Sequence, residues 1–443
     1  MLVRLRALFE SFRDSLFFLP ALFVLAAVVV AQGMLAADER ISLESVPTFL
    51  RFTVESSREL LSTVAGATIT VTGVVFALTA LSVQLASSQF SPRVVRGFLR
   101  DRFAQTAIGF MAATFTYSLV VLRAVRTPDG VDSSVVPNLS SALALVLAVG
   151  VVIAILAYVD HTAQSLQATQ LIGRITRGTV ALVSKHFPDV GDGQDQPPSL
   201  PPPAAPGERV DTPRSGWLQQ VSEDDLLDAL PPGATVRVEV RVGSFVHAGR
   251  RLCTLWTDRQ GDENGQHRRI TRAFAVGRVR TMQQDVAFGI RQLVDVALRA
   301  LSTGVNDATT AYECIVHLGE VVFEILRRDL PPAVRRGQDG QRVLRPSELT
   351  HDDYVGRAFD QIRTNAVSMP DLCVALLRTL GSVATELEDR GLGHRIHPLA
   401  RQARLVVAGA TAQDPLPEDL ALVHQAAITA GFGPIQEESG AGR

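Results

Sequence analysis

The sequence predicts an α-helical membrane protein. We expect four transmembrane helices and then a cytoplasmic α+β domain, made of a small barrel-sandwich-like β module and a helical bundle. Of the 443 residues, 47% are hydrophobic, and the mean hydropathy of +0.18 is high for a soluble protein of this length. The apolar residues are concentrated before residue 160. A proline-rich stretch separates them from a region with strand and helix periodicities.

Four segments are long and apolar enough to cross a hydrocarbon core of about 30 Å, which takes roughly 20 helical residues. They are residues 15–36, 60–86, 104–125 and 139–159, within a predicted transmembrane domain of residues 15–160. Arginines in residues 1–14 precede the first segment, as in a signal peptide, but no convincing A-x-A cleavage site follows. We therefore expect this segment to be retained as a span.

The distribution of arginine predicts the orientation. Three arginines lie in residues 1–14, and the loop between the second and third spans carries Arg93, Arg96, Arg100 and Arg102. The loop after the first span mixes basic and acidic residues, and the loop before the fourth span is nearly neutral. Because positively charged loops remain on the cytoplasmic side, both termini are predicted to be cytoplasmic. The four loop arginines could bind anionic lipid headgroups or surround the inner mouth of a pore.

The second span has two opposed faces of small and polar residues. At 100° per residue, one arc about 80° wide contains Ser62, Gly66, Thr70, Gly73, Ala77, Ala80 and Gln84. The opposite side contains Thr68, Thr72, Thr79 and Ser82. Close helix packing explains such residues most simply, because small side chains let backbones approach. The alternative is that one arc faces a pore, and two such faces on one helix favour a homo-oligomer in the lipid bilayer.

Ionisable residues are missing from the middle of every predicted span: none contains Asp, Glu, Lys or His there. Such groups usually mark proton relays and coupled pumps. Their absence argues against a proton-driven transporter and leaves a passive channel, or no transport at all.

The remaining chain divides by composition into five parts. We expect a juxtamembrane helix at 161–186, a proline-rich linker at 187–216, a β-rich module at 217–284, a helical domain at 285–436 and a disordered tail at 437–443. Residues 236–242 alternate apolar and charged side chains as in a half-buried strand, and a further strand is expected at 270–279. The turn at 243–249 locally resembles that of a barrel-sandwich hybrid, but it has no counterpart of the carrier lysine.

Helical periodicity in the last domain predicts a helix from residue 285, a second at 308–328, and others at about 350–366, 370–389, 393–412 and 417–430. Polar residues near the junction of the first two helices could converge there. A buried capping and ion-pair network is the favoured explanation, and a ligand or regulatory site is the alternative. These residues are Asp285, Arg291, Asp295, Asn306 and Asp307.

Two motifs resemble a known family. One is the run Phe288-Gly-Ile-Arg-Gln-Leu-Val-Asp-Val-Ala-Leu-Arg-Ala-Leu-Ser302 with Gly304, Asn306, Asp307 and Thr309, and the other is Leu85-Ala-Ser-Ser-Gln-Phe-Ser-Pro-Arg93. Both are similar to the bacterial predicted-membrane-protein family of domain of unknown function 2254. Thr303 and Ala308 stand where family members commonly have proline. The resemblance implies a topology in the bacterial plasma (inner) membrane, but no established reaction.

Enzyme motifs are scarce, so we expect no enzyme and no cofactor. There is no Walker loop, no G-x-G-x-x-G after a strand, no H-E-x-x-H and no G-x-S-x-G. The pairs Cys314/His317 and His394/His397 lack two further ligands nearby, so no metal site is predicted. The net charge of −2 gives no indication of nucleic-acid binding.

Two functions remain. The first is an oligomeric, channel-like or passive transport protein, with the second span along the path and the cytoplasmic domain for regulation or assembly. The second is a non-conducting membrane scaffold or sensor whose cytoplasmic domain binds a partner or ligand.

Overall fold

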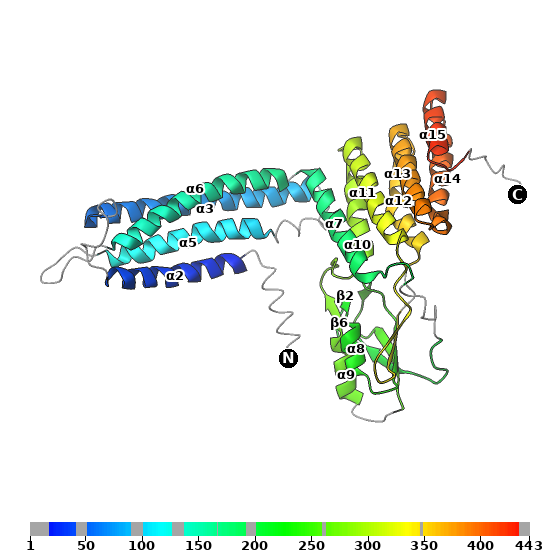
Figure 1. The fold of residues 1–443 in the computed structure, drawn as a ribbon, viewed down its shortest axis with the longest axis horizontal. Coiled ribbons are helices and arrows are strands. Elements are labelled where there is room, and N and C mark those ends of the chain that lie inside the picture. Colours follow the sequence, from blue (N-terminus) through cyan, green and yellow to red (C-terminus); the bar gives the residue numbers. More distant parts are fainter. Residues whose placement is uncertain are drawn as a thin grey trace, which may run out of the picture. The chain divides into compact units, whose positions relative to one another are not determined.

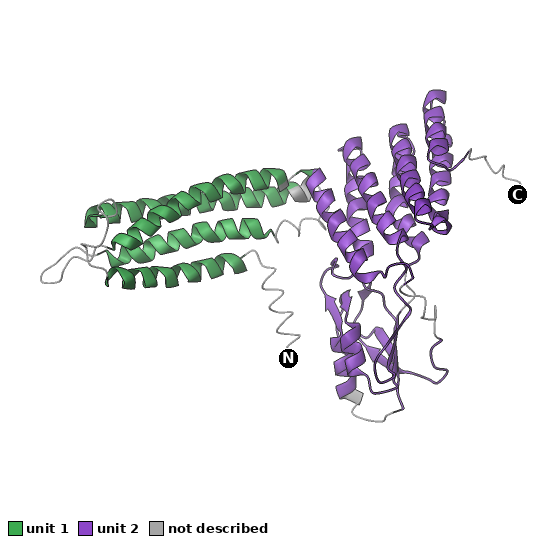
Figure 2. Cartoon of the chain, viewed as in Figure 1, with its two compact units in different colours: residues 1–167 green, residues 168–443 purple. Residues whose placement is uncertain are grey.

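The computed structural model describes residues 17–40, 51–89, 101–125, 137–165, 167–191, 201–258, 263–345 and 349–433. The chain divides into two compact units, residues 1–167 and residues 168–443 (Figure 2). Among the described residues, unit 1 contains the apolar helices, and unit 2 contains the strands together with the other helices.

The described residues of unit 1 form four helices, and all four are long and apolar enough to cross a membrane. They are α2 (Phe18–Asp38), α3 (Val54–Gln89), α5 (Arg102–Ala124) and α6 (Asn138–Ser165), which confirms the four predicted apolar helices. With 36 residues, α3 is about 54 Å long at about 1.5 Å per residue. It therefore exceeds a hydrocarbon core of about 30 Å and has turns outside it.

The third predicted span, α5, holds unit 1 together. It packs against α2, α3 and α6, and its Met111 and Val121 are fully buried.

The start of α6 is fixed by a neighbouring helix, because Asp38 at the end of α2 accepts hydrogen bonds from the backbone of Leu139 (2.9 Å) and Ser140 (3.0 Å). These amides have no acceptor within α6, so the carboxylate supplies the missing cap.

Unit 2 has a layer of helices side by side, with the sheets at one end of it (Figure 1). The helices are α7 (Ala168–His186), α10 (Val286–Ala300), α11 (Ala308–Leu326), α12 (His351–Ala366), α13 (Pro370–Asp389), α14 (His397–Thr411) and α15 (Pro417–Thr429), with a 3-10 turn at Gly393–Arg395. The bounds of α12, α13 and α15 follow the predicted ranges closely, whereas α7 begins at Ala168 rather than at 161 and α14 at His397 rather than at 393. The central helix is α11, which packs against α7, α10, α12 and α13.

The strands form two sheets. They are β1 (Glu208–Asp211), β2 (Gly216–Val221), β3 (Thr235–Val238), β4 (Phe245–Val246), β5 (Arg251–Trp256), β6 (Phe274–Gly277), β7 (Val334–Arg336) and β8 (Arg342–Leu344). The five-stranded sheet has the order β1-β5-β3-β8-β7 and the three-stranded sheet the order β4-β2-β6. Only β3 and β8 pair in parallel among the described strands. Two short helices, α8 (Glu223–Ala229) and α9 (Glu263–Arg272), accompany them.

The structure also differs from two predicted domain boundaries and from one predicted strand. The linker expected at 187–216 contains β1, which pairs with β5. The β part also extends past 217–284, because β7 and β8 come from the expected helical domain and β8 pairs with β3. Ile270 belongs to α9 rather than to a strand at 270–279. Pairing between distant segments determines these features, and local alternation does not report it.

Close approach of α7 and α10 depends on Gly289. A Cβ atom at Gly289 would lie 2.1 Å from Oγ1 of Thr179 on α7. That oxygen is fixed by its own hydrogen bond to the carbonyl of Ile175, at 2.7 Å. The two helices can therefore approach this closely only because residue 289 has no side chain.

We expect Gly289→Ala to lower the melting temperature of unit 2, because overpacking a helix contact costs about 1–3 kcal/mol. Both tryptophans of the chain, Trp217 and Trp256, lie in strands of unit 2. Their fluorescence in the solubilised full-length protein follows its unfolding. Gly304→Ala is the control, since a Cβ there meets nothing within 4 Å. Equal melting temperatures for the two variants would contradict this account of the contact.

Candidate functional site

One face of α3 is small, polar and open to the surroundings of the protomer. We call it the α3 stripe. All its members are exposed: Ser62, Gly66, Thr70, Gly73, Ala77, Ala80 and Gln84. A Cβ atom at Gly66 or Gly73 would meet nothing within 4 Å. The hydroxyl of Thr70 donates to the carbonyl of Gly66 at 2.8 Å, so its lone pairs, rather than its proton, are free to face outward.

The opposite face of α3 packs inside unit 1. Thr68 and Val75 are buried at 3% and 1% exposure. The hydroxyl of Thr79 lies 2.5 Å from that of Tyr158 on α6. Of the two polar faces expected from the sequence, one thus serves packing within the protomer, and the α3 stripe is the other.

Two carboxylates continue the α3 stripe at its N-terminal end. At 100° per residue, Glu55 and Glu59 fall on the same arc as Gly66 and Gly73, and both are exposed. Neither makes a hydrogen bond or ion pair with the residues that the structure describes. The sequence interpretation missed them because it started the span at residue 60, although their spacing was visible.

The predicted group of loop arginines is only partly described. Arg93, Arg96 and Arg100 lie outside the described residues, while Arg102 is the exposed first residue of α5. Beside it, Asp101 caps α5 by accepting from the amide of Phe103.

The five polar residues expected at one helix junction do not come together. Asp285 caps the first turn of α10 by accepting from the amide of Phe288 at 3.0 Å. Arg291 pairs with Asp295 in the middle of that helix, at 2.7 Å. Asn306 and Asp307 follow its far end. With 15 residues, α10 is about 22 Å long. Asp285 and Asp307 therefore lie near opposite ends of this helix.

The turn before α11 has the geometry of a cap. Asn306 is in the left-handed region with φ 49°, which asparagine tolerates better than most residues. Asp307 accepts from the amide of Thr310 at 3.0 Å and from its hydroxyl. These hydrogen bonds, the hydroxyl first, lower the pKa of Asp307. The contacts of Asp307 thus support the capping explanation.

A cavity of about 300 Å³ opens where strands and helices of unit 2 meet. We call it the junction cavity. Its walls include valines of β2, β3 and the segment after it, the start of α10, the end of α7 and part of α12. Its charged and titratable members are His186, Glu223, Arg241, Arg280, Asp285, Arg345 and Arg357, with Tyr354 beside them. Except for Asp285, sequence analysis did not single them out, because they come from segments far apart in the chain.

Two of the four arginines in the junction cavity are paired. Arg280 binds the buried carboxylate of Asp285 at 2.6 Å, and Arg345 binds Glu223 at 2.5 Å. Burial on its own would raise the pKa of Glu223, but Arg345 and then Arg335 outweigh it and hold the pKa below its usual value.

Arg241 and Arg357 are different. Both are exposed, and neither side chain makes a hydrogen bond or a close ion pair with any described residue. Hydrogen bonds from Thr350 lower the pKa of Asp353, and the charges of Arg357 and Arg241 add to this effect. That carboxylate is already engaged in the capping box of α12, so the two guanidinium groups retain free donors toward the cavity.

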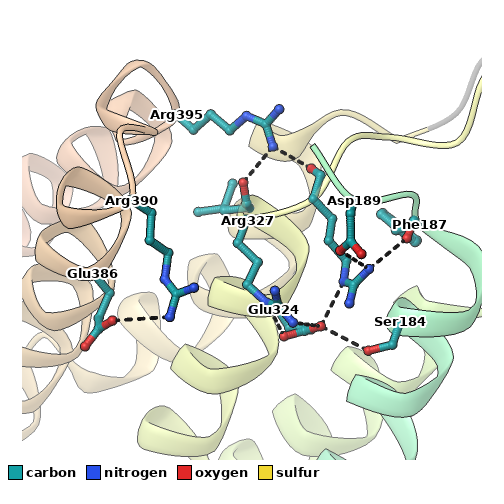
Figure 3. A network of polar contacts seen from close by, with 10 residues as sticks. Ser184, Phe187, Asp189, Glu324, Arg327, Glu386, Arg390 and Arg395 are labelled. Carbon is teal, nitrogen blue, oxygen red and sulfur yellow. Dashed lines mark hydrogen bonds and ion pairs between the residues drawn. The ribbon is translucent and has the colours of Figure 1, made fainter. Parts of the chain in front are cut away.

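A separate polar network joins the ends of α7 and α11 (Figure 3). Glu324 accepts hydrogen bonds from Ser184 at 3.0 Å, from Arg327 at 2.6 Å and from Arg328 at 2.9 Å. Arg328 also contacts Asp189 and the carbonyl of Phe187. These contacts hold the end of α7 against the end of α11 within the described part of the chain.

Metal and thiol chemistry find no support in the described part of the chain. No group of three potential metal ligands occurs among these residues. Cys253, Cys314 and Cys373 are all buried free thiols. Burial raises the pKa of Cys253 to about 12 and that of Cys373 to about 11, so both thiols are protonated near neutral pH.

The comparisons with known proteins agree with this architecture. Residues 13–382 match the family model described as predicted membrane protein, domain of unknown function 2254. The chain belongs to this family. It is 33% identical over 442 residues to uncharacterized proteins of Mycobacterium bovis and of two strains of Mycobacterium tuberculosis, covering 97% of this chain and 82% of each relative. No solved structure gives a significant match.

Acid should weaken the Glu324 network. Burial would raise the pKa of Glu324, but hydrogen bonds from Arg327, Arg328 and Ser184 hold it below its usual 4.5. A carboxyl with a depressed pKa stabilises the fold above its unfolded-state pKa, and this stabilisation is lost as the pH falls through the folded-state value. Glu324→Gln should therefore destabilise unit 2 by about 1–3 kcal/mol at neutral pH, with a smaller difference at about pH 4.

Tryptophan-monitored melting at the two pH values measures this effect. Glu388→Gln is the control, because Glu388 is exposed on α13 and its removal should change little at either pH. A Glu324→Gln penalty of the same size at both pH values would contradict the assignment.

Proposed function

We propose that this protein forms a homo-oligomeric channel-like assembly for passive transport in the bacterial plasma membrane, with α3 along the path. The observation that carries the proposal is the exposure of the entire α3 stripe in the protomer. The arginine distribution supports a cytoplasmic location for both termini and for unit 2, which would then serve as gate or assembly domain.

The comparison of α3 with α6 supports a protein partner or a path, rather than lipid, against the α3 stripe. Large apolar side chains cover the exposed face of α6, namely Val146, Val149, Val152, Ile153 and Leu156. This composition is typical of a lipid-facing surface. The α3 stripe instead has glycines and hydroxyls, which let helix backbones approach and serve as interface residues in membranes.

Cyclic symmetry would place the α3 stripes of all protomers around a common axis. Homo-oligomers mostly have cyclic symmetry, so the same arc of every α3 would face the axis. The Thr70 side chains of all protomers would then form one ring. This ring would present oxygen lone pairs to the path, because each hydroxyl donates its proton to the carbonyl of Gly66 in its own helix. Each ring of Glu55 or Glu59 would present carboxylates at the outer end. Rings of acidic side chains select cations, and we therefore propose that cations are the permeant species.

The second candidate function is a non-conducting sensor or scaffold. The junction cavity favours it, because a cavity with free donors in unit 2 can bind a ligand whether or not the protein conducts.

Bulky replacements on the α3 stripe test the first function. Thr70→Phe or Gly73→Phe should disrupt the oligomer or block conductance, since either ring would fill the space at the axis. Leu156→Phe on the exposed face of α6 is the control and should leave both properties unchanged. Mass photometry of the solubilised protein and recordings from reconstituted bilayers give the two readouts. A monomeric protein that is silent over a range of ions and voltages would exclude the channel.

Carboxylate replacement tests the ion class. Glu55→Gln with Glu59→Gln should reduce the preference for cations over anions about tenfold, because the fixed charge at the mouth is lost. Reversal potentials under a salt gradient measure this preference. Glu39→Gln, in the same outer region but on the end of α2, is the control. A conducting protein whose reversal potential is unaffected by the double replacement would refute the cation assignment.

A further inference from the structure

The junction cavity has an excess of positive charge. Four arginines line it against two carboxylates, Glu223 and Asp285, so the fixed charges sum to plus two before His186 is considered. The two carboxylates neutralise Arg345 and Arg280. The excess therefore belongs to Arg241 and Arg357, which lie on the segment after β3 and on α12.

A buried, unpartnered nitrogen points to the same ligand. Nε2 of His186 is inaccessible to solvent and has no hydrogen-bond partner among the described residues, and His186 lines the junction cavity. Leaving a buried polar atom unpaired costs about 1–3 kcal/mol. A ligand oxygen would give this nitrogen a partner if binding turned the imidazole toward the cavity.

The start of α10 adds donors on the facing wall. Val286 and Ala287, its first residues, line the cavity. The first amides of a helix have no acceptor within it, and the helix dipole is positive there. Asp285 occupies the amide of Phe288, which leaves the earlier amides for an anion.

Size and lining narrow the ligand to an organic anion. About 300 Å³ is at the lower end of the range for small-molecule sites, about 300–1,000 Å³. The valines Val221, Val238, Val240 and Val242 form apolar walls beside the arginines, which an inorganic ion alone would leave uncovered. A phosphomonoester carries a charge of about −1.5 to −2 at neutral pH, which matches the excess of two, whereas a monocarboxylate does not.

We propose that the junction cavity binds a small organic phosphomonoester, with Arg241 and Arg357 as its principal charged contacts and His186 and the start of α10 around its oxygens. The proposal is independent of whether the protein conducts ions. The phosphate group can come from a soluble metabolite or from a lipid headgroup, and both share the chemistry that the cavity recognises.

Calorimetry on the solubilised full-length protein tests the site. The probes are glycerol 3-phosphate, adenosine 5′-monophosphate and short-chain dihexanoyl phosphatidic acid, with acetate as the monoanion control at equal ionic strength. We expect at least one phosphomonoester to bind and acetate not to bind. Binding of the phosphatidic acid alone would assign the source as a lipid headgroup, and binding of either soluble ester would assign it as a metabolite.

Variants locate the binding. Arg241→Gln and Arg357→Gln should each weaken binding about tenfold, because each removes a charge-assisted hydrogen bond. Neither arginine is in a close ion pair within the described chain, and each only adds to the effect of Thr350 on Asp353, so the melting temperature should change little. Arg404→Gln, an exposed arginine of α14 outside the cavity, is the matched control. Failure of all three esters to bind, or equal affinity in the two cavity variants and wild type, would overturn the proposal.

Discussion

The carboxylate of Asp285 joins the strands of unit 2 to its helices. It is 3% exposed, caps α10 and pairs with Arg280. Gly243, with φ +84°, passes so close that a Cβ atom there would lie 2.0 Å from its oxygen. A buried carboxylate without these partners would cost several kcal/mol. The turn at Gly243, the segment before α10 and α10 itself must therefore meet at one point, and the junction cavity is the space left beside it.

In unit 1 the equivalent constraint comes from the bilayer, where polar groups must be satisfied within the protein. The threonines of α3 meet it by donating to carbonyls one turn earlier, as Thr68, Thr70, Thr72 and Thr79 do. These hydroxyls therefore need no partner from outside the helix to be tolerated. Some of them lie on the exposed face of α3, whereas Val146, Val149, Val152, Ile153 and Leu156 are exposed on α6, and this placement is not required for insertion. This difference between α3 and α6 is the reason to expect that the α3 stripe has a function beyond membrane insertion.

How much of the structure the sequence predicts depends on how far apart in the chain the interacting residues are. Apolar length and helical periodicity are local, so the four apolar helices and the bounds of α12, α13 and α15 could be predicted closely. Pairing of β8 with β3 depends on segments about a hundred residues apart, and no local pattern reports it. The junction cavity was missed for this reason, since Arg241 and Arg357 look like ordinary surface residues until the fold brings them together.

The helix α7 is the element of unit 2 that follows the membrane helices in the chain and also reaches the junction cavity. His186, its last residue, lines the junction cavity. Its first residue, Ala168, follows the end of α6 at Ser165 after only two intervening residues. The Glu324 network and the contact at Gly289 hold α7 to α11 and α10. A ligand that shifted the end of α7 would therefore have to move it together with those helices of unit 2, and the strength of these contacts would set the free-energy cost of that shift.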